Sequence, residues 1–240
     1  MVALAFAPEL VVPKLSLSDR ILRLLRRVDV RRADTAEQRE AIFRLRYQAY
    51  LREGAIAPDA GERFADRFDG AANSWIFGVY VDGALLSSIR LHVASKASPE
   101  LPAFQVFPDV LAPQLASGKI LIDPTRFVAD RSASRRYPEL CYVTTRLAVA
   151  ASEYFHADLL LATVRAEHQA FYRRVFGHRL ICEPRPYPSL SKPISLMALD
   201  YAGARDKLFE RHPFLRSSSL ERCNLFARPL PVLSALRPAA

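Results

Sequence analysis

A short apolar segment at residues 120–128, ILIDPTRFV, carries two charged side chains suited to proton transfer and to carboxylate binding. Asp123 and Arg126 have Ile, Leu, Phe and Val on both sides, whereas a solvated strand would alternate polar and apolar residues. We therefore expect at least one of these charges to point into a partly buried space, where an unpaired charge is costly. Two interpretations fit: an ion pair that only stabilises the core, or a strand of an active site.

Three more charged side chains lie in comparable settings. Arg90 falls in the second strand of a hairpin predicted at residues 74–93, around an Asp-Gly turn. Asp66 and Asp69 lie in residues 54–73, which lose helical periodicity and contain three glycines and one proline. Two phenylalanines interleave with these acids, as expected for a loop held against another part of the fold; a solvated surface loop is the alternative.

Apolar periodicity places helices and strands around these charges. We predict one α/β unit with a mixed sheet, no internal repeat and no interdomain linker. The residues after 204 are predicted to add one helix and a tail that packs down. The predicted helices cover 16–27, 37–52, 106–115, 139–155 and 168–176, and the predicted strands outside the hairpin cover 28–33, 120–128, 158–164, 178–183 and 194–201.

The composition sets outer limits on the class of protein. Half of the 240 residues are hydrophobic, which is ample for a core, and no run reaches the roughly 18 apolar residues of a membrane-spanning helix. Residues 1–13 lack a basic segment ahead of their apolar ones, so we predict no secretory signal and a cytoplasmic location. Cys141, Cys182 and Cys223 are too far apart for a disulfide framework or a zinc site, and we expect no metal.

The net charge of +9 predicts attraction to a polyanion, which can be nucleic acid, an anionic membrane or an acidic protein. We expect no nucleic acid, because the sequence has no zinc-finger spacing, no aromatic RNA-binding motif and no lysine-rich tail. Residues 16–27 form a basic amphipathic helix that we expect to pack on its own domain. Docking of this helix on an acidic partner, or peripheral contact with a membrane, is the alternative.

The order of elements, together with the block HQAFYRRVFG at residues 168–177, resembles the GNAT acyltransferase superfamily. In that superfamily a helix with a Phe-Tyr pair precedes a glycine and the final strands. The resemblance implies an α/β fold with a single mixed, mostly antiparallel sheet flanked by helices, in residues 28–203. An N-terminal arm and helix, residues 1–27, would precede this domain, and an extension, residues 204–240, would pack on it.

Within that superfamily the middle of the chain resembles the acyl-homoserine-lactone synthases. The charged motifs of that family occur here in the same order, although an aspartate replaces the glutamate of the last motif and the tryptophan before the paired acids is absent. The matching residues are Arg46 with Tyr47 and Tyr50, the pair Asp66 and Asp69, Arg90 with Leu91, and Asp123 with Arg126 and Phe127.

Residues 162–188 are more similar to the related N-acyl amino acid synthases, which join a long-chain acyl group from acyl carrier protein to the α-amine of an amino acid. We therefore predict an N-acyltransferase with these two partners. It would bind no cofactor and would use the acyl-phosphopantetheine of the carrier as donor substrate. The alternatives are an acyl-homoserine-lactone synthase that uses S-adenosylmethionine and a non-catalytic GNAT-like domain that binds polyanions.

The connection at residues 129–138 bears on the donor. GNAT proteins that use CoA commonly hold its pyrophosphate in a glycine-rich turn at a helix N-terminus. This connection has no glycine and is expected to be a basic loop. Its arginines, Arg131, Arg135 and Arg136, are predicted to bind the single phosphate of phosphopantetheine and the acidic surface of the carrier; an ordinary basic surface loop is the alternative.

The resemblance also suggests roles for the charged residues. The acids Asp66, Asp69 and Asp123 would hold the substrate ammonium or relay its proton, and Arg46, Arg90 and Arg126 would bind the substrate carboxylate or fix the acids. Tyr172 corresponds to the tyrosine that in many GNAT enzymes protonates the leaving thiolate, with a core tyrosine as the alternative. No serine or cysteine lies in a nucleophile motif, so we predict direct transfer without a covalent enzyme intermediate.

Overall fold

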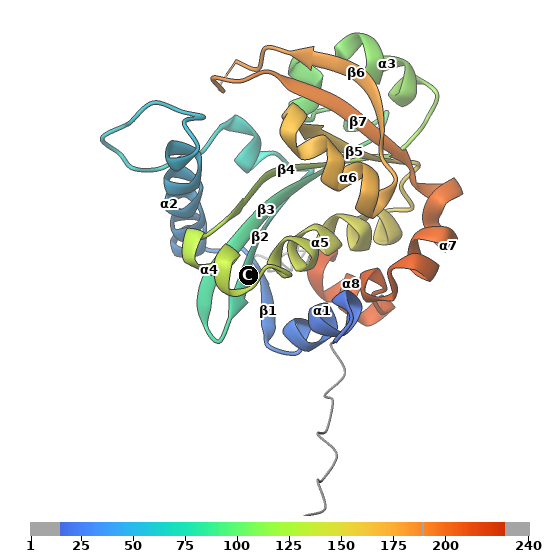
Figure 1. The fold of residues 1–240 in the computed structure, drawn as a ribbon. Coiled ribbons are helices and arrows are strands. Elements are labelled where there is room, and N and C mark those ends of the chain that lie inside the picture. The colour runs from blue at the N-terminus through green and yellow to red at the C-terminus, as the bar shows by residue number, and fades with distance from the viewer. Residues whose placement is uncertain (1–14, 189, 229–240) are drawn as a thin grey trace, which may run out of the picture.

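The computed structural model describes residues 15–188 and 190–228, and the predicted arm at residues 1–14 and the end of the predicted tail, residues 229–240, lie outside them. A single seven-stranded sheet has the order β1-β2-β3-β4-β5-β7-β6 (Figure 1). Neighbouring strands are antiparallel except β4 and β5, which are parallel. This confirms the predicted α/β fold. The strands are β1 (Val28–Arg32), β2 (Ser74–Val81), β3 (Ala84–Ala94), β4 (Leu121–Ala129), β5 (Leu159–Val164), β6 (Arg179–Arg185) and β7 (Ile194–Asp200).

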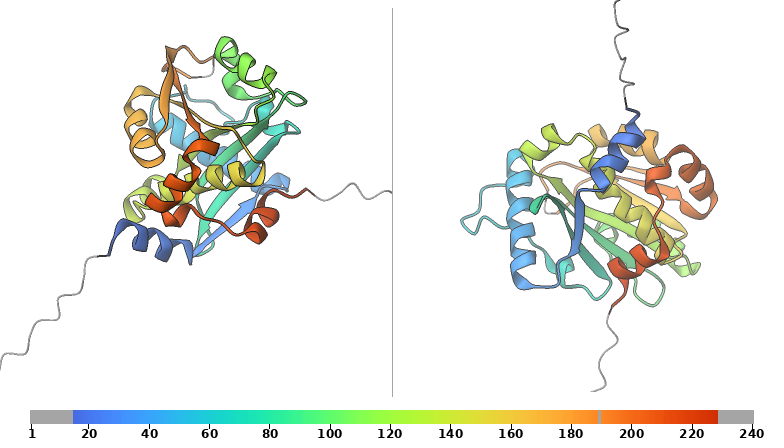
Figure 2. Two further views of the ribbon diagram at one scale, coloured as in Figure 1. Left: turned by 90° about the vertical axis from the view of Figure 1, so that its right-hand side faces the viewer. Right: turned by 90° about the horizontal axis from the view of Figure 1, so that it is seen from below.

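Helices cover both faces of the sheet. One face packs against α1, α5, α6, α7 and α8, and the other against α2, α3 and the short 3-10 helices η1 and η2, as the views of Figure 2 show for α2 and α5. None of the described helices is long and apolar enough to cross a membrane. The helices are α1 (Leu17–Leu25), α2 (Ala36–Arg52), α3 (Pro108–Ala116), α4 (Arg131–Arg136), α5 (Leu140–Tyr154), α6 (Gln169–Phe176), α7 (Tyr201–Arg211) and α8 (Ser219–Phe226), with η1 (Arg67–Gly70), η2 (Pro102–Gln105), η3 (Ala166–His168) and η4 (Pro213–Leu215).

Two sequence-based expectations about helices are wrong. The connection at residues 129–138, expected to be a loop, contains α4, because the carboxylate of Asp130 caps it by accepting from the N–H groups of Ser132 and Ala133. The segment after residue 204 contributes to two helices instead of one. Asp200 caps α7 and Ser218 caps α8, so each helix has its own start signal.

The described part of the C-terminal segment packs on α5. Arg146 of α5 donates to the carbonyl oxygens of Phe214, at 2.9 Å, and Arg216, at 2.5 Å, and pairs with Glu221. The indole N–H of Trp75 on β2 donates to the carbonyl oxygen of Phe226 at 3.2 Å. These contacts satisfy buried polar groups and anchor α8 beside the sheet.

The parallel strands β4 and β5 separate soon after they begin. They pair only at Leu121–Leu159 and Ile122–Leu160. Further along, β4 contains a β-bulge: the register shifts between Ser88 and Arg90 of β3, which places two β4 residues, one of them Arg126, opposite a single β3 residue. The fold therefore opens a gap in the middle of the sheet, with a bulged strand along one side.

Candidate active site

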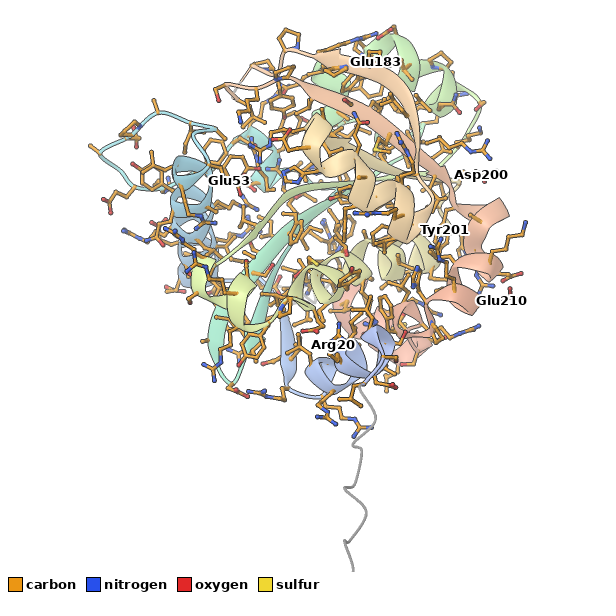
Figure 3. All side chains as sticks on the ribbon, viewed as in Figure 1. Arg20, Glu53, Glu183, Asp200, Tyr201 and Glu210 are labelled. Atoms are coloured by element: carbon orange, nitrogen blue, oxygen red, sulfur yellow. The ribbon has the colours of Figure 1, made fainter. Side chains whose placement is uncertain are left out.

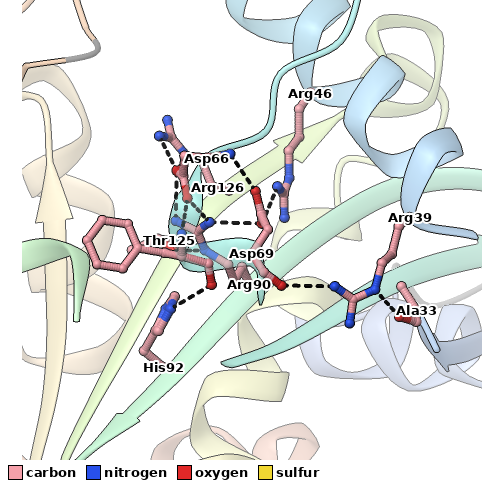
Figure 4. A network of polar contacts seen from close by, with 10 residues as sticks. Ala33, Arg39, Arg46, Asp66, Asp69, Arg90, His92, Thr125 and Arg126 are labelled. Atoms are coloured by element: carbon pink, nitrogen blue, oxygen red, sulfur yellow. Dashed lines mark hydrogen bonds and ion pairs between the residues drawn. The ribbon is translucent and has the colours of Figure 1, made fainter. Parts of the chain in front are cut away.

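A buried cluster of ion pairs lies over the face of the sheet that carries α2 (Figure 4). Asp66 accepts from Arg90 of β3, with Oδ1 2.5 Å from Nη1, and from Arg126 of β4, with Oδ2 2.6 Å from Nη2. Burial acts to raise the pKa of Asp66, but hydrogen bonds and charges from these two arginines outweigh it and hold that pKa well below its usual range. Asp66 is therefore ionised at neutral pH and is a weak proton acceptor.

Asp69 occupies the second half of the same cluster. Its Oδ1 lies 2.7 Å from Nη1 of Arg46 and 2.8 Å from Nη1 of Arg90, and its Oδ2 accepts from the N–H of Asp66 at 2.8 Å. The last bond belongs to a capping box that shapes η1. Arg39 of α2 donates to the Asp69 carbonyl oxygen at 2.9 Å. The paired acids are thus held by α2, β3 and β4 together.

The cluster carries more positive than negative charge. It contains three guanidinium groups, from Arg46, Arg90 and Arg126, and two carboxylates, and Arg46 and Arg90 have no exposed surface. Arg126 is 7% exposed and is the member that lines a cavity. An excess cation in a partly buried site favours an anionic ligand.

The backbone and side chain of Arg126 are both constrained. Its φ of +54° lies in the left-handed region, which non-glycine residues rarely adopt and which often marks functional sites. Its guanidinium stacks on Phe64, 4.4 Å from the ring centroid, and on Tyr50 at 5.5 Å. Phe64 belongs to the loop that we expected to be held against another part of the fold. Together with Tyr50 it forms a wall over the bulge in β4.

The main cavity fills the gap between β4 and β5 and has a volume of about 440 Å³, within the range of small-molecule sites. It passes from the α5 and α6 face of the sheet to the end of α2. Its lining comprises Ala49, Tyr50, Arg52, Glu53, Ala55, Pro124, Thr125, Arg126, Phe127, Val128, Ala129, Ser134, Cys141, Thr163, Val164, Arg165, His168, Phe171, Tyr172, Leu190, Lys192 and Ile194.

Tyr172 reaches this cavity from α6. Its ring packs edge-on against Phe171 and His178, with centroids 5.3 and 5.6 Å away. Burial raises the pKa of Tyr172 well above its ordinary value, so the phenol stays protonated at neutral pH. The structure thus places a phenolic proton donor at the cavity.

The three predicted carrier-binding arginines lie on α4 at the edge of the main cavity. Arg131, Arg135 and Arg136 are all exposed, whereas Ser134 of the same helix lines the cavity. The guanidinium of Arg136 stacks on Tyr137 at 5.3 Å. These arginines can therefore meet a partner on the surface but do not line the cavity itself.

Sequence reasoning missed several polar side chains that line the cavity: Arg52, Glu53, Arg165, His168 and Lys192. Arg165 joins the two sides of the opening, with Nη2 2.5 Å from Oε2 of Glu53 and 2.9 Å from Nε2 of His168; Figure 3 shows Glu53 at the end of α2. The sequence did contain one signal for Arg165, which is its position. It directly follows the run predicted as a buried strand, and residues at strand ends often carry function.

A second cavity of about 510 Å³ lies on the other side of Phe64. Tyr47 shapes it, because its hydroxyl is 3.1 Å from the carbonyl oxygen of Asp59 and 3.0 Å from the N–H of the same residue. Two residues, Ala55 and Leu190, line both cavities. The remaining lining is formed by Ile56, Ala57, Arg63, Pro188 and Ser191.

Asp123 lies apart from the charged cluster. It is fully buried, lines neither cavity, and accepts from the N–H of Ala103 through Oδ2 at 3.1 Å. Burial raises its pKa to about 7. Asp123 and Arg126 do not pair with each other, because the bulge directs Arg126 to Asp66. Within the described part of the chain, no cluster of three or more His, Cys, Asp or Glu residues could hold a metal.

The strand order, the separated β4 and β5 and the bulged β4 define a GNAT-like acyltransferase fold. Residues 41–200 match the family described as FeeM, N-acyl amino acid synthase FeeM. The chain belongs to this family; it is an acyltransferase, and its family implies an amino acid substrate. None of the curated proteins matches the sequence.

Solved structures share this fold. FeeM from uncultured soil microbes is 20% identical with a TM-score of 0.64, over 75% of this chain and 94% of FeeM. TofI, in a complex with an inhibitor and MTA, is 16% identical with a TM-score of 0.54, over 72% and 91% of the chains. The AHL synthase LasI is 14% identical with a TM-score of 0.53, over 71% and 88%. At these identities the likeness concerns the fold.

Proposed function

We propose that the protein transfers a long-chain fatty acyl group from the phosphopantetheine thioester of acyl carrier protein to the α-amine of an amino acid. The observation that carries this proposal is the main cavity, which lies between β4 and β5 and ends beside the charged cluster at Arg126. The facing edges of the two strands carry no sheet hydrogen bonds to each other beyond Ile122–Leu160. The carbonyl group of a thioester arm that lies between these strands would accept hydrogen bonds from their backbone N–H groups.

We assign acyl carrier protein rather than CoA as the acyl donor because of the charge and the backbone conformation of the connection after β4. The connection after β4 has no glycine and presents Arg131, Arg135 and Arg136 on an exposed helix, which suits the acidic surface of a carrier. A six-residue helix capped by Asp130 also leaves little room for a pyrophosphate, because the Asp130 carboxylate already accepts from two of its N–H groups.

The amino acid would approach from the second cavity, across the wall formed by Phe64 and Tyr50. Its carboxylate would pair with Arg126, which the excess positive charge of the cluster favours, and its ammonium would lie near the ionised Asp66. Because the pKa of Asp66 is lowered, we infer that this carboxylate holds the ammonium while solvent takes the proton.

Transfer then needs one new bond and one broken bond. The neutral amine attacks the thioester carbonyl, and backbone N–H groups of the bulged strand stabilise the oxyanion. As the carbon–nitrogen bond is completed, the nitrogen releases a proton to solvent and the carbon–sulfur bond breaks. Tyr172 protonates the departing thiolate and regains its proton from solvent.

Purified protein incubated with hexadecanoyl and dodecanoyl acyl carrier protein and the proteinogenic amino acids should yield N-acyl amino acids detectable by mass spectrometry. The same acyl groups on CoA should react much more slowly. Absence of any acylated amine would contradict the proposal. Faster reaction from CoA would contradict the assigned donor, and a lactone formed only with S-adenosylmethionine would contradict the assigned acceptor.

A further inference from the structure

A row of three polar side chains crosses the sheet beneath η1 and η2. Ser74 on β2 is directly opposite His92 on β3, and His92 is directly opposite Asp123 on β4. Directly opposed residues of antiparallel strands point to the same face, so the three side chains share the face that carries η1 and η2. Each has a buried polar atom without a hydrogen-bond partner among the described residues: Ser74 Oγ, His92 Nδ1 and Asp123 Oδ1.

The other polar atoms of this row are already bonded, which determines what the unbonded atoms can do. Nε2 of His92 lies 3.2 Å from the carbonyl oxygen of Phe68, a contact that requires a proton on Nε2. Burial lowers the pKa of His92 to about 3, so the ring is neutral and Nδ1 is an acceptor. Asp123 Oδ2 accepts from Ala103, so Oδ1 is the site left for a proton.

The unbonded atoms are chemically complementary. A protonated Asp123 offers an O–H donor, His92 Nδ1 offers a lone pair, and the Ser74 hydroxyl can donate or accept. None of them contacts another within hydrogen-bond distance, and ordered water between neighbouring members of the row would complete their hydrogen bonds. Buried polar atoms are nearly always hydrogen-bonded, so three unbonded atoms in one row indicate a shared site.

We propose that Ser74, His92 and Asp123 form one hydrogen-bonded relay through ordered water, in which Asp123 carries the proton and which positions the η1 turn. His92 holds the carbonyl of Phe68, one of the two residues between Asp66 and Asp69. Asp123 holds the first turn of η2 through Ala103. Both are positioning residues, and their expected effect on catalysis rests on the proposed function.

A charge on Asp123 is disfavoured by its surroundings. Arg90 is the nearest cation on β3, but Asp66 and Asp69 pair with it at 2.5 and 2.8 Å. Tyr187 faces the same region, and its pKa is raised by burial, so it is also uncharged. Neutral Asp123 beside a neutral His92 therefore costs less than a carboxylate facing the Nδ1 lone pair.

The residue types match those of a serine nucleophile triad, but the geometry excludes that role. His92 uses Nε2 to hold Phe68, so this nitrogen cannot activate a hydroxyl. His92 and Asp123 have no exposed surface, and none of the three residues lines either cavity. A substrate carbonyl therefore cannot reach Ser74. The three residues instead affect the active site by positioning η1.

Nitrogen NMR of the His92 ring tests the relay without any substrate. Between about pH 5 and about pH 6, where Asp123 keeps its proton, His92 should be the neutral Nε2–H tautomer with a hydrogen-bonded Nδ1. Asp123→Asn keeps a donor and an acceptor and should preserve the Nδ1 shift, whereas Asp123→Leu, which fills the space without polar atoms, should move it to an unbonded value. A charged His92, an Nδ1–H tautomer, or an unchanged shift in the leucine variant would overturn the relay.

Activity of the same variants tests the positioning role. Asp123→Asn should keep kcat within about twofold of the natural protein, and Asp123→Leu should lose at least about tenfold while still melting cooperatively. An inactive Asp123→Asn would overturn the proposal, because the residue would then act through its charge. If the leucine variant does not fold, Ser74→Ala provides the same NMR test, and an unmoved Nδ1 shift would then count against the relay. Since the NMR results need no turnover, failure of the proposed reaction would be recognised separately.

Discussion

The carboxylate of Asp66, at the N-terminus of η1, and the guanidinium of Arg126, in the bulge of β4, are joined by two hydrogen bonds of 2.6 and 3.1 Å. This pair connects the covering loop to the strand that borders the main cavity. Because Arg126 lines the cavity and Asp66 is 20% exposed, the pair is where the charged cluster can meet a substrate. The proposed function therefore places substrate binding and acyl transfer beside these two groups.

Asp66→Asn should remove the carboxylate that pairs with Arg126 and one of the two carboxylates that pair with Arg90. Breaking a largely buried pair costs about 3 kcal/mol of stability, and the acylation rate at low substrate should fall by about a hundredfold or more. Denaturant unfolding and kcat/KM would measure these effects. The control is Asp29→Asn, whose pair with Arg31 is exposed, and which should change the free energy of unfolding by less than about 0.5 kcal/mol. Equal effects in the two variants would contradict the role of the cluster.

Tyr172→Phe should lower kcat by about a hundredfold with little change in KM, because only the proton for the departing thiolate is lost. The pKa of Tyr172 is raised by burial, so its loss should remove no ionisation from the pH–rate profile near neutrality. Tyr142→Phe, on the neighbouring α5 and outside the cavity lining, is the matched control. A fully active Tyr172→Phe variant would contradict the proton-donor role and would indicate that Tyr172 only packs in the core.

The protonation of Asp123 predicts how stability varies with pH. Its pKa is about 7 in the folded chain and about 3.9 in an unfolded chain, so the folded state holds a proton that the unfolded state releases. The contribution is complete below about pH 4 and is lost as pH rises through about 7, a change of about 4 kcal/mol. Asp123→Asn should therefore become more stable relative to the natural protein over this range. A constant difference in unfolding free energy would contradict a protonated Asp123.

The exposed arginines of α4 should affect the carrier and not the chemistry. Arg131→Glu with Arg135→Glu should raise KM for acyl carrier protein by about tenfold and weaken its salt dependence. The rate with a short acyl thioester that lacks the carrier should stay unchanged. Arg23→Glu with Arg26→Glu, at exposed positions in α1 and at its C-cap, is the charge-matched control. A larger effect of the α1 pair would move the docking surface to that helix.

Much of the fold could be predicted from local sequence signals. The Asp-Gly turn fixed the β2–β3 hairpin, and capping residues marked α1 and α2. The helix α4 was missed because its start depends on the Asp130 cap within a segment that otherwise resembles a basic loop. Periodicity alone does not distinguish such a short helix from a loop.

The site was harder to predict, because its pairings span long stretches of sequence. The sequence indicated that at least one of Asp123 and Arg126 is buried, but the pairing of Arg126 with Asp66 in place of Asp123 follows from the bulge in β4. The Arg165–Glu53 pair joins residues 112 positions apart and carries no local signal. Likewise, the row of Ser74, His92 and Asp123 exists only once the strand register is known.

Acyl transfer to the α-amine is tested most directly by a single-turnover reaction of the purified protein with dodecanoyl acyl carrier protein and an amino acid mixture labelled at the α-nitrogen with a heavy isotope. We expect mass spectrometry to find the acyl chain on the labelled nitrogen as the carrier thioester disappears, and Arg126→Ala, while folded, to form no such product. Thioester loss without a labelled amide, or undiminished product from Arg126→Ala, would contradict this expectation.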